Sequence, residues 1–354
     1  MTLSLSLVSA LILSSHAFAS EPPVVSTTEA RPDPVNAPSV SLLKDRFIEA
    51  VDMAEKNKAL TQLAKTAPTS GQDVAGLFDL FSRFPDREVR AAVMDSLAQI
   101  PPNSPQLEPL FLAYLKQPEH ESQLFGINGA FRLRTRAALP MIRAIAERKC
   151  AAASVSETTM MSERNAWWTQ FEALSVLAQW EGEKALPLLQ RKSLESPVVG
   201  RLLGRFFWTQ TLPNLKSWSQ APDSLSRERA LQAAGASIEP ADARATREDM
   251  LKLLRDPKAD RELRHQLALK IGLSSTDEEI ESLIREHDAV ASGSERLFWA
   301  SAIFVSRSQK ITPLLLRYAL QTDDDGLRRG ATAQLADMFG ETQAASMIED
   351  AKKK

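Results

Sequence analysis

The feature that most constrains the fold is an apolar helical stripe that recurs along most of the chain. After the near-identical pentapeptides DREVR and DRELR, which begin at Asp86 and Asp260, aliphatic residues follow at every fourth position. Residues four apart share one face of an α-helix, so each segment predicts a helix with one buried side. The third position of each stripe gives eight registered residues: Leu97, Leu133, Leu177, Phe207, Ile238, Ile271, Val305 and Leu335.

These registered residues recur at a nearly constant interval. Their spacings are 36, 44, 30, 31, 33, 34 and 30 residues. A period of this size predicts stacked repeats, in which each unit buries its apolar face against its neighbours. The one long spacing predicts an insertion. We place it in the Ser- and Thr-rich segment 149–165 and expect a protruding loop there.

Prolines predict a second helix in each repeat. Four of them stand just ahead of leucine-rich runs: Pro109, Pro140, Pro187 and Pro313. The first turn of a helix tolerates proline, because its N–H has no partner within the helix at that point. The predicted fold class is therefore all-α, an α-solenoid of about eight stacked antiparallel helix pairs over 71–354. An N-terminal capping helix region is expected at 41–70, and Asp86 and Asp260 are expected to cap their helices.

The pattern resembles HEAT-repeat proteins with short bacterial repeats. The resemblance is carried by the prolines above, the openings Asp86/Arg90 and Asp260/Arg264, and the LAQ or LAD closings at Leu97, Leu177 and Leu335. It implies a curved array of helix pairs whose second helices line a concave surface. It implies no single activity, because most HEAT-like proteins are scaffolds or peptide-binding platforms and a bacterial minority are lyases acting on bilin chromophores. Tetratricopeptide repeats share the period, but their Trp, Gly and Tyr pattern is not repeated here.

The amino terminus predicts export. Residues 3–18 are apolar or small, and Ala17-Phe18-Ala19 gives the small-x-small pattern that a signal peptidase cleaves, so 1–19 is a predicted signal peptide. No Lys or Arg precedes the apolar run, which is atypical of a signal peptide. The expected location is periplasmic; the alternatives are secretion, or tethering by an uncleaved anchor. Segment 20–40 holds five prolines and is predicted to be a disordered linker.

Composition and motifs argue against several classes of function. Lys and Arg number 43 against 45 Asp and Glu, so no overall charge attracts nucleic acid. Cys150 is the only cysteine, so no internal disulfide forms. His120, His265 and His287 lack the spacing of a zinc site, and no phosphate-binding loop or nucleophile elbow occurs. We therefore predict no catalytic residues, no metal and no cofactor.

Three arginines and one tryptophan are the candidate partner-binding residues. Arg143, Arg191 and Arg317 each stand three or four residues after a second-helix proline, so the three are expected to approach one another on the inner surface and to favour an acidic partner. The alternative is that they are solvated cations or form salt bridges between repeats. Trp168 follows Trp167 directly, and adjacent helical residues point about 100° apart, so one of the two is expected near the surface.

The leading functional hypothesis is an exported, non-catalytic scaffold that binds a protein or peptide partner on the solenoid surface. One alternative is a HEAT-like lyase or small-ligand-binding protein, and another is a purely structural envelope protein. A scaffold predicts an open groove, whereas a lyase predicts a closed polar pocket. A structural protein predicts neither.

Overall fold

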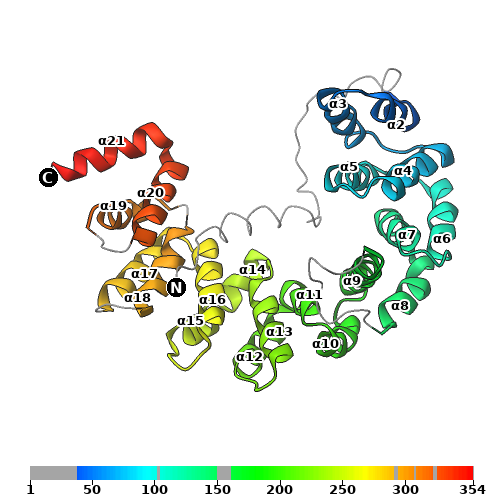
Figure 1. Ribbon diagram of the computed structural model, residues 1–354. Coiled ribbons are helices and arrows are strands. Elements are labelled where there is room, and N and C mark those ends of the chain that lie inside the picture. Colours follow the sequence, from blue (N-terminus) through cyan, green and yellow to red (C-terminus); the bar gives the residue numbers. More distant parts are fainter. Residues whose placement is uncertain are drawn as a thin grey trace. The chain divides into compact units, whose positions relative to one another are not determined.

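The protein is all-α, as the sequence predicts. The computed structural model describes residues 38–101, 104–149, 161–290, 294–306, 308–321 and 325–353, and all regular secondary structure in those ranges is helical (Figure 1). The predicted signal peptide, most of the predicted linker and Cys150 lie outside these residues. The helices group into two compact units, which we call the N-terminal unit, ending at Glu195, and the C-terminal unit, beginning at Ser196.

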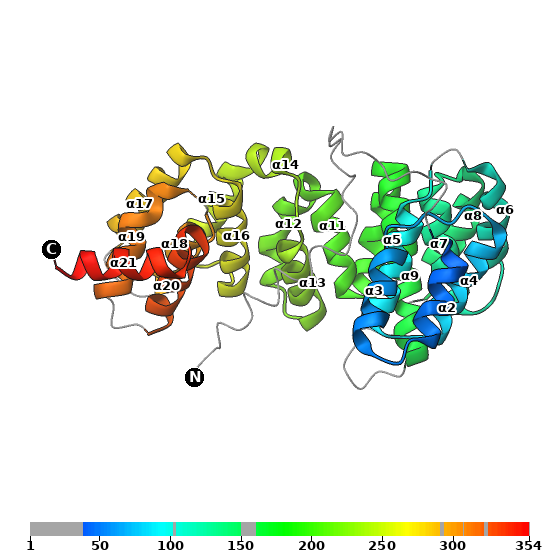
Figure 2. The same ribbon diagram turned by 90° about the horizontal axis from the view of Figure 1, so that it is seen from above.

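In the N-terminal unit, alternate helices pack against one another: each odd-numbered helix from α3 to α9 contacts the next odd-numbered helix. Its helices are α2 (Val40–Glu49), α3 (Met53–Leu63), α4 (Gly71–Arg83), α5 (Arg87–Ala98), α6 (Glu108–Leu115), α7 (His120–Arg132), α8 (Leu139–Glu147), α9 (Met161–Glu181) and α10 (Leu186–Glu195). Contacts run from α3 to α5, from α5 to α7 and from α7 to α9. Between them, α6 packs on α7 and α8 packs on α9 (Figure 2). The predicted capping region thus consists of α2 and α3.

The C-terminal unit repeats this arrangement. Its helices are α11 (Gly200–Phe206), α12 (Trp208–Ser219), α13 (Ser224–Gly235), α14 (Pro240–Ala245), α15 (Arg247–Arg255), α16 (Arg261–Ser274), α17 (Asp277–Ala289), α18 (Ser294–Phe304), α19 (Thr312–Gln321), α20 (Asp325–Phe339) and α21 (Glu341–Lys352). Successive contacts join α11 to α13, α13 to α16, α16 to α18 and α18 to α20. We call α5, α7, α9, α11, α13, α16, α18 and α20 the stripe helices, because they carry the predicted apolar stripes.

Burial confirms most of the predicted register. Six registered residues have side chains no more than 9% exposed: Leu97, Leu133, Leu177, Phe207, Ile271 and Leu335. Ile238 and Val305 are wrong as fully buried positions; α13 ends at Gly235 and α18 at Phe304. Leu133 and Phe207 also follow the ends of their helices and are nevertheless buried, whereas neighbouring helices do not fully cover Ile238 and Val305. Both residues lie past their helix and are only half-buried. In α13 the buried face is instead made of small side chains at Ala230, Ala233 and Ala234.

The predicted second helices also form. Pro109, Pro140, Pro187 and Pro313 each occupy the second residue of α6, α8, α10 and α19, respectively. The predicted loop at 149–165 is wrong over 161–165, because α9 already begins at Met161. A 21-residue helix satisfies its backbone hydrogen bonds internally, so it extends well ahead of the tryptophans. Residues 150–160 lie outside the described ranges.

Only one of the two predicted aspartate caps forms a cap. Asp260 accepts hydrogen bonds from the backbone N–H groups of Glu262 and Leu263 at the start of α16. Asp86 stands at the same position before α5, but its side chain makes no capping hydrogen bond there, so that prediction is wrong. The near-identical sequence at the two helix starts therefore does not by itself determine whether the aspartate caps the helix.

The arginine of the duplicated pentapeptide reaches across to the next stripe helix. Arg264 on α16 donates both guanidinium branches to Glu295 on α18, 31 residues later, and its Nε donates to the carbonyl oxygen of Leu254 at 2.8 Å. The guanidinium also lies 4.3 Å from the centre of the Phe298 ring. In the other copy, Arg90 lies over the Phe81 ring. The carboxylate near Arg90 is that of Glu121, which also follows its arginine by 31 residues. The repeated Arg thus faces an acid one repeat away.

Candidate functional site

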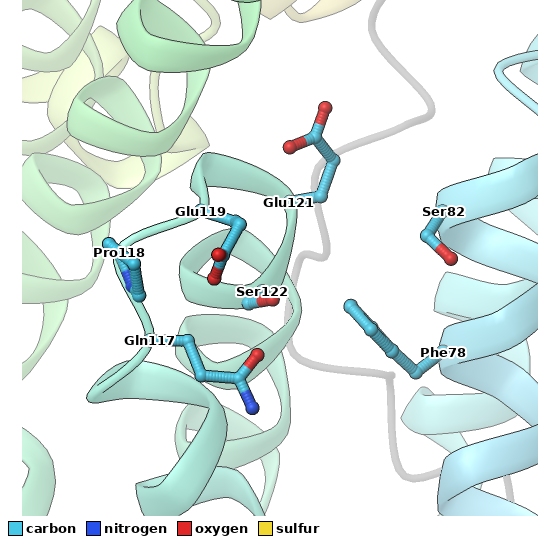
Figure 3. Close-up of a pocket in the computed structure, with 7 residues that line it drawn as sticks. All are labelled: Phe78, Ser82, Gln117, Pro118, Glu119, Glu121 and Ser122. Atoms are coloured by element: carbon cyan, nitrogen blue, oxygen red, sulfur yellow. The ribbon is translucent and has the colours of Figure 1, made fainter.

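An open pocket lies in the N-terminal unit, between α4 and the beginning of α7 (Figure 3). Its volume is about 630 Å³. Seven residues line it: Phe78 and Ser82 on α4, Gln117, Pro118 and Glu119 in the turn after α6, and Glu121 and Ser122 in the first turn of α7. Phe81 of α4 contacts Phe125 of α7, and the pocket lies between α4 and the turn that leads into α7.

One wall of the pocket is aromatic. Phe78 is half-buried, and its ring centre lies 4.6 Å from that of Tyr114 on α6 and 5.4 Å from that of Phe125 on α7. Phe125 is fully buried and contacts Phe81 and Phe111 as well. Burial raises the pKa of the Tyr114 hydroxyl. This aromatic cluster fixes the Phe78 ring in place, because the rings that contact it belong to two other helices, α6 and α7.

The opposite wall is polar and acidic. Glu119 occupies the N-cap position of α7 and is exposed, and Glu121 follows in the first turn. Carboxylates at these positions stabilise the positive end of a helix. The side-chain amide of Gln123 donates to the carbonyl oxygen of Gln117 at 2.7 Å, which holds the turn against α7. The geometry of the rim is therefore set by the fold.

Ser122 is the least expected residue in this wall. Its side chain is only 2% exposed, and Figure 3 shows the hydroxyl directed into the pocket, on the side that faces Phe78. Within the described residues that hydroxyl forms no hydrogen bond with the protein. A buried polar group normally has a partner. Sequence reasoning missed this position, because a serine in HESQLF carries no signal until the packing around it is known.

The structure places the three predicted arginines in two different units. Arg143 on α8 donates to Glu181 at the end of α9 and lies 3.8 Å from Glu147, and Arg317 on α19 donates to Asp288 on α17 at 2.5 Å. Both therefore make the salt bridges between helices that were the alternative to a binding role. Arg191 on α10 is exposed. The convergence of all three on one surface stays a prediction, since Arg317 belongs to the C-terminal unit and the others to the N-terminal unit.

The expectation that one of the paired tryptophans is near the surface is confirmed. Trp168 is 38% exposed, whereas Trp167 is 9% exposed. Their ring centres are 5.7 Å apart, and both rings stack against Phe171 one turn further along α9. Trp168 is thus the outer member of an aromatic cluster, and its role in binding stays a prediction.

A buried histidine and a partly buried lysine in the C-terminal unit were not found from the sequence. His287 on α17 is 1% exposed, and its Nε2 lies 2.5 Å from the hydroxyl of Tyr318 on α19. Burial lowers the pKa of this histidine. Lys270 on α16 donates to the carbonyl oxygen of Ala236 and lies 5.2 Å from the ring of Trp208, and burial lowers the pKa of its ammonium to about 7. Both tie neighbouring helices together.

Neither group forms part of a metal site. Within the described residues, no group of three or more His, Cys, Asp and Glu side chains is arranged to hold a metal ion. In the same part of the chain, no helix combines the length and apolar character needed to cross a bilayer.

Comparisons with known proteins add little. No family model matches the sequence. A search of the curated proteins gave no match either. Among solved structures, one similar chain is described as the crystal structure of an engineered protein. It is 16% identical, with 88% of this chain and 92% of the other covered and a TM-score of 0.28. The description of the fold therefore rests on this chain's own helices.

Proposed function

We propose that the protein is an exported, HEAT-like α-solenoid that binds a protein or peptide partner without catalysing a reaction. The observation that carries this proposal is the form of the pocket: it is an open recess between successive helices, with an aromatic wall and an acidic rim. A recess of this kind accepts a side chain from a larger molecule. A lyase acting on a small cofactor would need a site that surrounds its substrate.

The chemistry of the pocket lining also favours binding over catalysis. Ser122 is its only buried hydroxyl, and that hydroxyl makes no hydrogen bond to a base. A nucleophilic serine needs an adjacent base within about 3.2 Å to be activated. The repeated contacts between stripe helices support a scaffold in a second way, because stacked repeats present equivalent positions in a row to an extended partner.

Affinity capture tests this function directly. We expect the full-length protein, expressed with its own amino terminus and a carboxyl-terminal tag, to retain a defined protein partner from the exported fraction of its native cells. Amino-terminal sequencing of the same sample should begin at Ser20, in agreement with the predicted cleavage. Recovery of intact Met1 from the cytoplasm would contradict export, and capture of no reproducible partner would contradict the scaffold role.

A further inference from the structure

We infer that the pocket between α4 and α7 receives the ammonium group of a lysine side chain, presented by a basic peptide segment of the partner. This inference rests on the proposed scaffold function and specifies the chemistry of its partner. Ser122, Phe78 and Glu119 supply three different kinds of contact for the same cation.

The first contact is the hydroxyl of Ser122. Ser122 is 2% exposed, and its hydroxyl is directed into the pocket and has no hydrogen-bond partner among the described residues, so in the empty pocket this hydroxyl can hydrogen-bond only to water. A hydroxyl oxygen has lone pairs that accept, and an ammonium has three N–H groups that donate and none that accept. A bound ammonium therefore satisfies Ser122 and leaves two donors for the rim.

The second contact is the Phe78 ring. Figure 3 shows the ring on the opposite side of the pocket from Ser122 and Glu119. Tyr114 and Phe125 both contact this ring, which fixes its position at the edge of the pocket. An aromatic face attracts a cation, and its edges also pack on the methylene groups of a lysine stem. A negatively charged ligand would meet the same ring unfavourably.

The third contact is the acidic rim. Glu119 is exposed at the mouth of the pocket, and Glu121 lies beside it with Arg90 as a neighbouring cation. The cation that α4 carries is already paired, because Nη1 of Arg83 lies 3.3 Å from Oδ2 of Asp79. The positive end of the α7 helix dipole explains why Glu119 and Glu121 stand at the start of this helix, but it explains only these two residues. That helix end gives no reason for a hydroxyl without a protein partner to face an aromatic ring, whereas a lysine side chain can contact the hydroxyl, the ring and the carboxylates together.

Short synthetic peptides test the inference on the mature protein. The probes are the acetylated and amidated pentapeptides Ala-Ala-Lys-Ala-Ala, Ala-Ala-norleucine-Ala-Ala and Ala-Ala-Glu-Ala-Ala, titrated while the amide NMR signals of the protein are followed. We expect the lysine peptide to shift the signals of Phe78 and Ser122 and to bind about tenfold more tightly than the norleucine peptide, with weaker binding at high salt. The glutamate peptide should leave these signals unchanged.

A double variant tests the two polar contacts together. Glu119→Gln combined with Ser122→Ala should weaken lysine-peptide binding about tenfold and leave norleucine-peptide binding unchanged. The matched control is Glu248→Gln, which neutralises an exposed glutamate in the first turn of α15. Equal binding of the lysine and norleucine peptides, or no shift at Phe78 and Ser122 with the lysine peptide, overturns the inference.

The same variants distinguish failure of this inference from failure of the proposed function. If wild type and the double variant capture the same partner equally well, the scaffold function stands and the lysine pocket is wrong. If the wild type captures no partner but the lysine peptide binds at Phe78 and Ser122, the pocket stands and the scaffold function is wrong. Circular dichroism of each variant confirms that it is folded before either comparison is made.

Discussion

At the residue scale, Lys270 is the side chain whose environment differs most from what its sequence suggests. It follows Leu267 in an amphipathic stripe helix, where a lysine normally marks the solvated face. Here the end of α13 and the Trp208 ring enclose its ammonium group, and desolvation lowers its pKa to about 7. Sequence periodicity locates the helix face but not the neighbour that covers it, so this burial could not be predicted.

The lowered pKa predicts how stability depends on pH. Between the folded pKa of about 7 and the unfolded value of 10.5, the unfolded chain binds the additional proton, so the wild-type free energy of unfolding should rise as pH increases through that range. Lys270→Met removes the group. The variant should therefore be more stable than wild type near pH 7, by a margin that shrinks toward pH 10.5.

Each pKa unit corresponds to about 1.4 kcal/mol of free energy. Near pH 7 we therefore expect the free energy of unfolding of Lys270→Met to exceed that of wild type by roughly 1–4 kcal/mol, after the lost hydrogen bond to Ala236 is subtracted. Urea unfolding at several pH values measures it. Lys252→Met is the control, because Lys252 is exposed on α15 and its pKa is raised by Asp249 instead. Parallel pH profiles for wild type and Lys270→Met would show that the ammonium is not desolvated.

The arginine of the duplicated pentapeptide shows what a sequence repeat does and does not reveal. The recurrence of Arg90 and Arg264 is visible in the sequence, and it correctly indicates an architectural role. The acid 31 residues later becomes a partner only once stripe helices are known to pack side by side. Arg143 and Arg317 were predicted to bind a partner, yet both pair with carboxylates on neighbouring helices. Spacing from a proline locates a residue along its helix, not the charge that faces it.

At the element scale, glycines allow neighbouring stripe helices to approach to backbone contact. A Cβ at Gly272 of α16 would lie 1.8 Å from the carbonyl oxygen of Ala302 on α18, and one at Gly204 of α11 would lie 2.1 Å from that of Ala233 on α13. Both distances are far shorter than any real contact, so each helix pair must separate to accept a side chain. The closest approaches within the C-terminal unit therefore depend on these two positions.

This packing predicts opposite outcomes for two glycine substitutions. Gly272→Ala should destabilise the protein by about 1–3 kcal/mol, because the added methyl group forces α16 away from α18. Gly235→Ala should be neutral or stabilising by up to about 1 kcal/mol, because the nearest atom to its Cβ would be 3.6 Å away and alanine favours a helix. Thermal unfolding of both variants measures the difference. A loss of stability with Gly235→Ala equal to that with Gly272→Ala would contradict this account.

Most of the elements themselves could be predicted. The apolar period and the prolines located the stripe helices and their partners, because both signals act within one helix. The errors occur where a helix ends: Ile238 and Val305 continue the period beyond the last turn of α13 and α18. The polar composition of 161–165 likewise suggested a loop where α9 has already begun. Helix ends depend on tertiary contacts, which a repeat period does not contain.

At the scale of the whole molecule, the contacts are local in sequence. Within each unit, a stripe helix contacts the next stripe helix along the chain, and the chain divides into compact units between Glu195 and Ser196. In proteins built from stacked repeats, stability is close to a sum of each repeat's own stability and its interfaces with adjacent repeats. A unit that contains several complete repeats thus holds most of the interactions that stabilise it.

The final prediction follows from this locality. Residues 38–195 and 196–354, produced separately, should each give a helical circular dichroism spectrum and a cooperative unfolding transition, because the stripe-helix contacts of each unit lie within it. A fragment ending at Ser274 is the matched comparison for the C-terminal unit. It retains α16 but removes α18, so Gly272 and Leu267 lose the helix that covers them, and we expect a lower melting temperature and a broader transition. If either complete unit is unfolded alone while the full chain is stable, local contacts do not account for the fold, and interactions beyond the stripe-helix series must supply the missing stability.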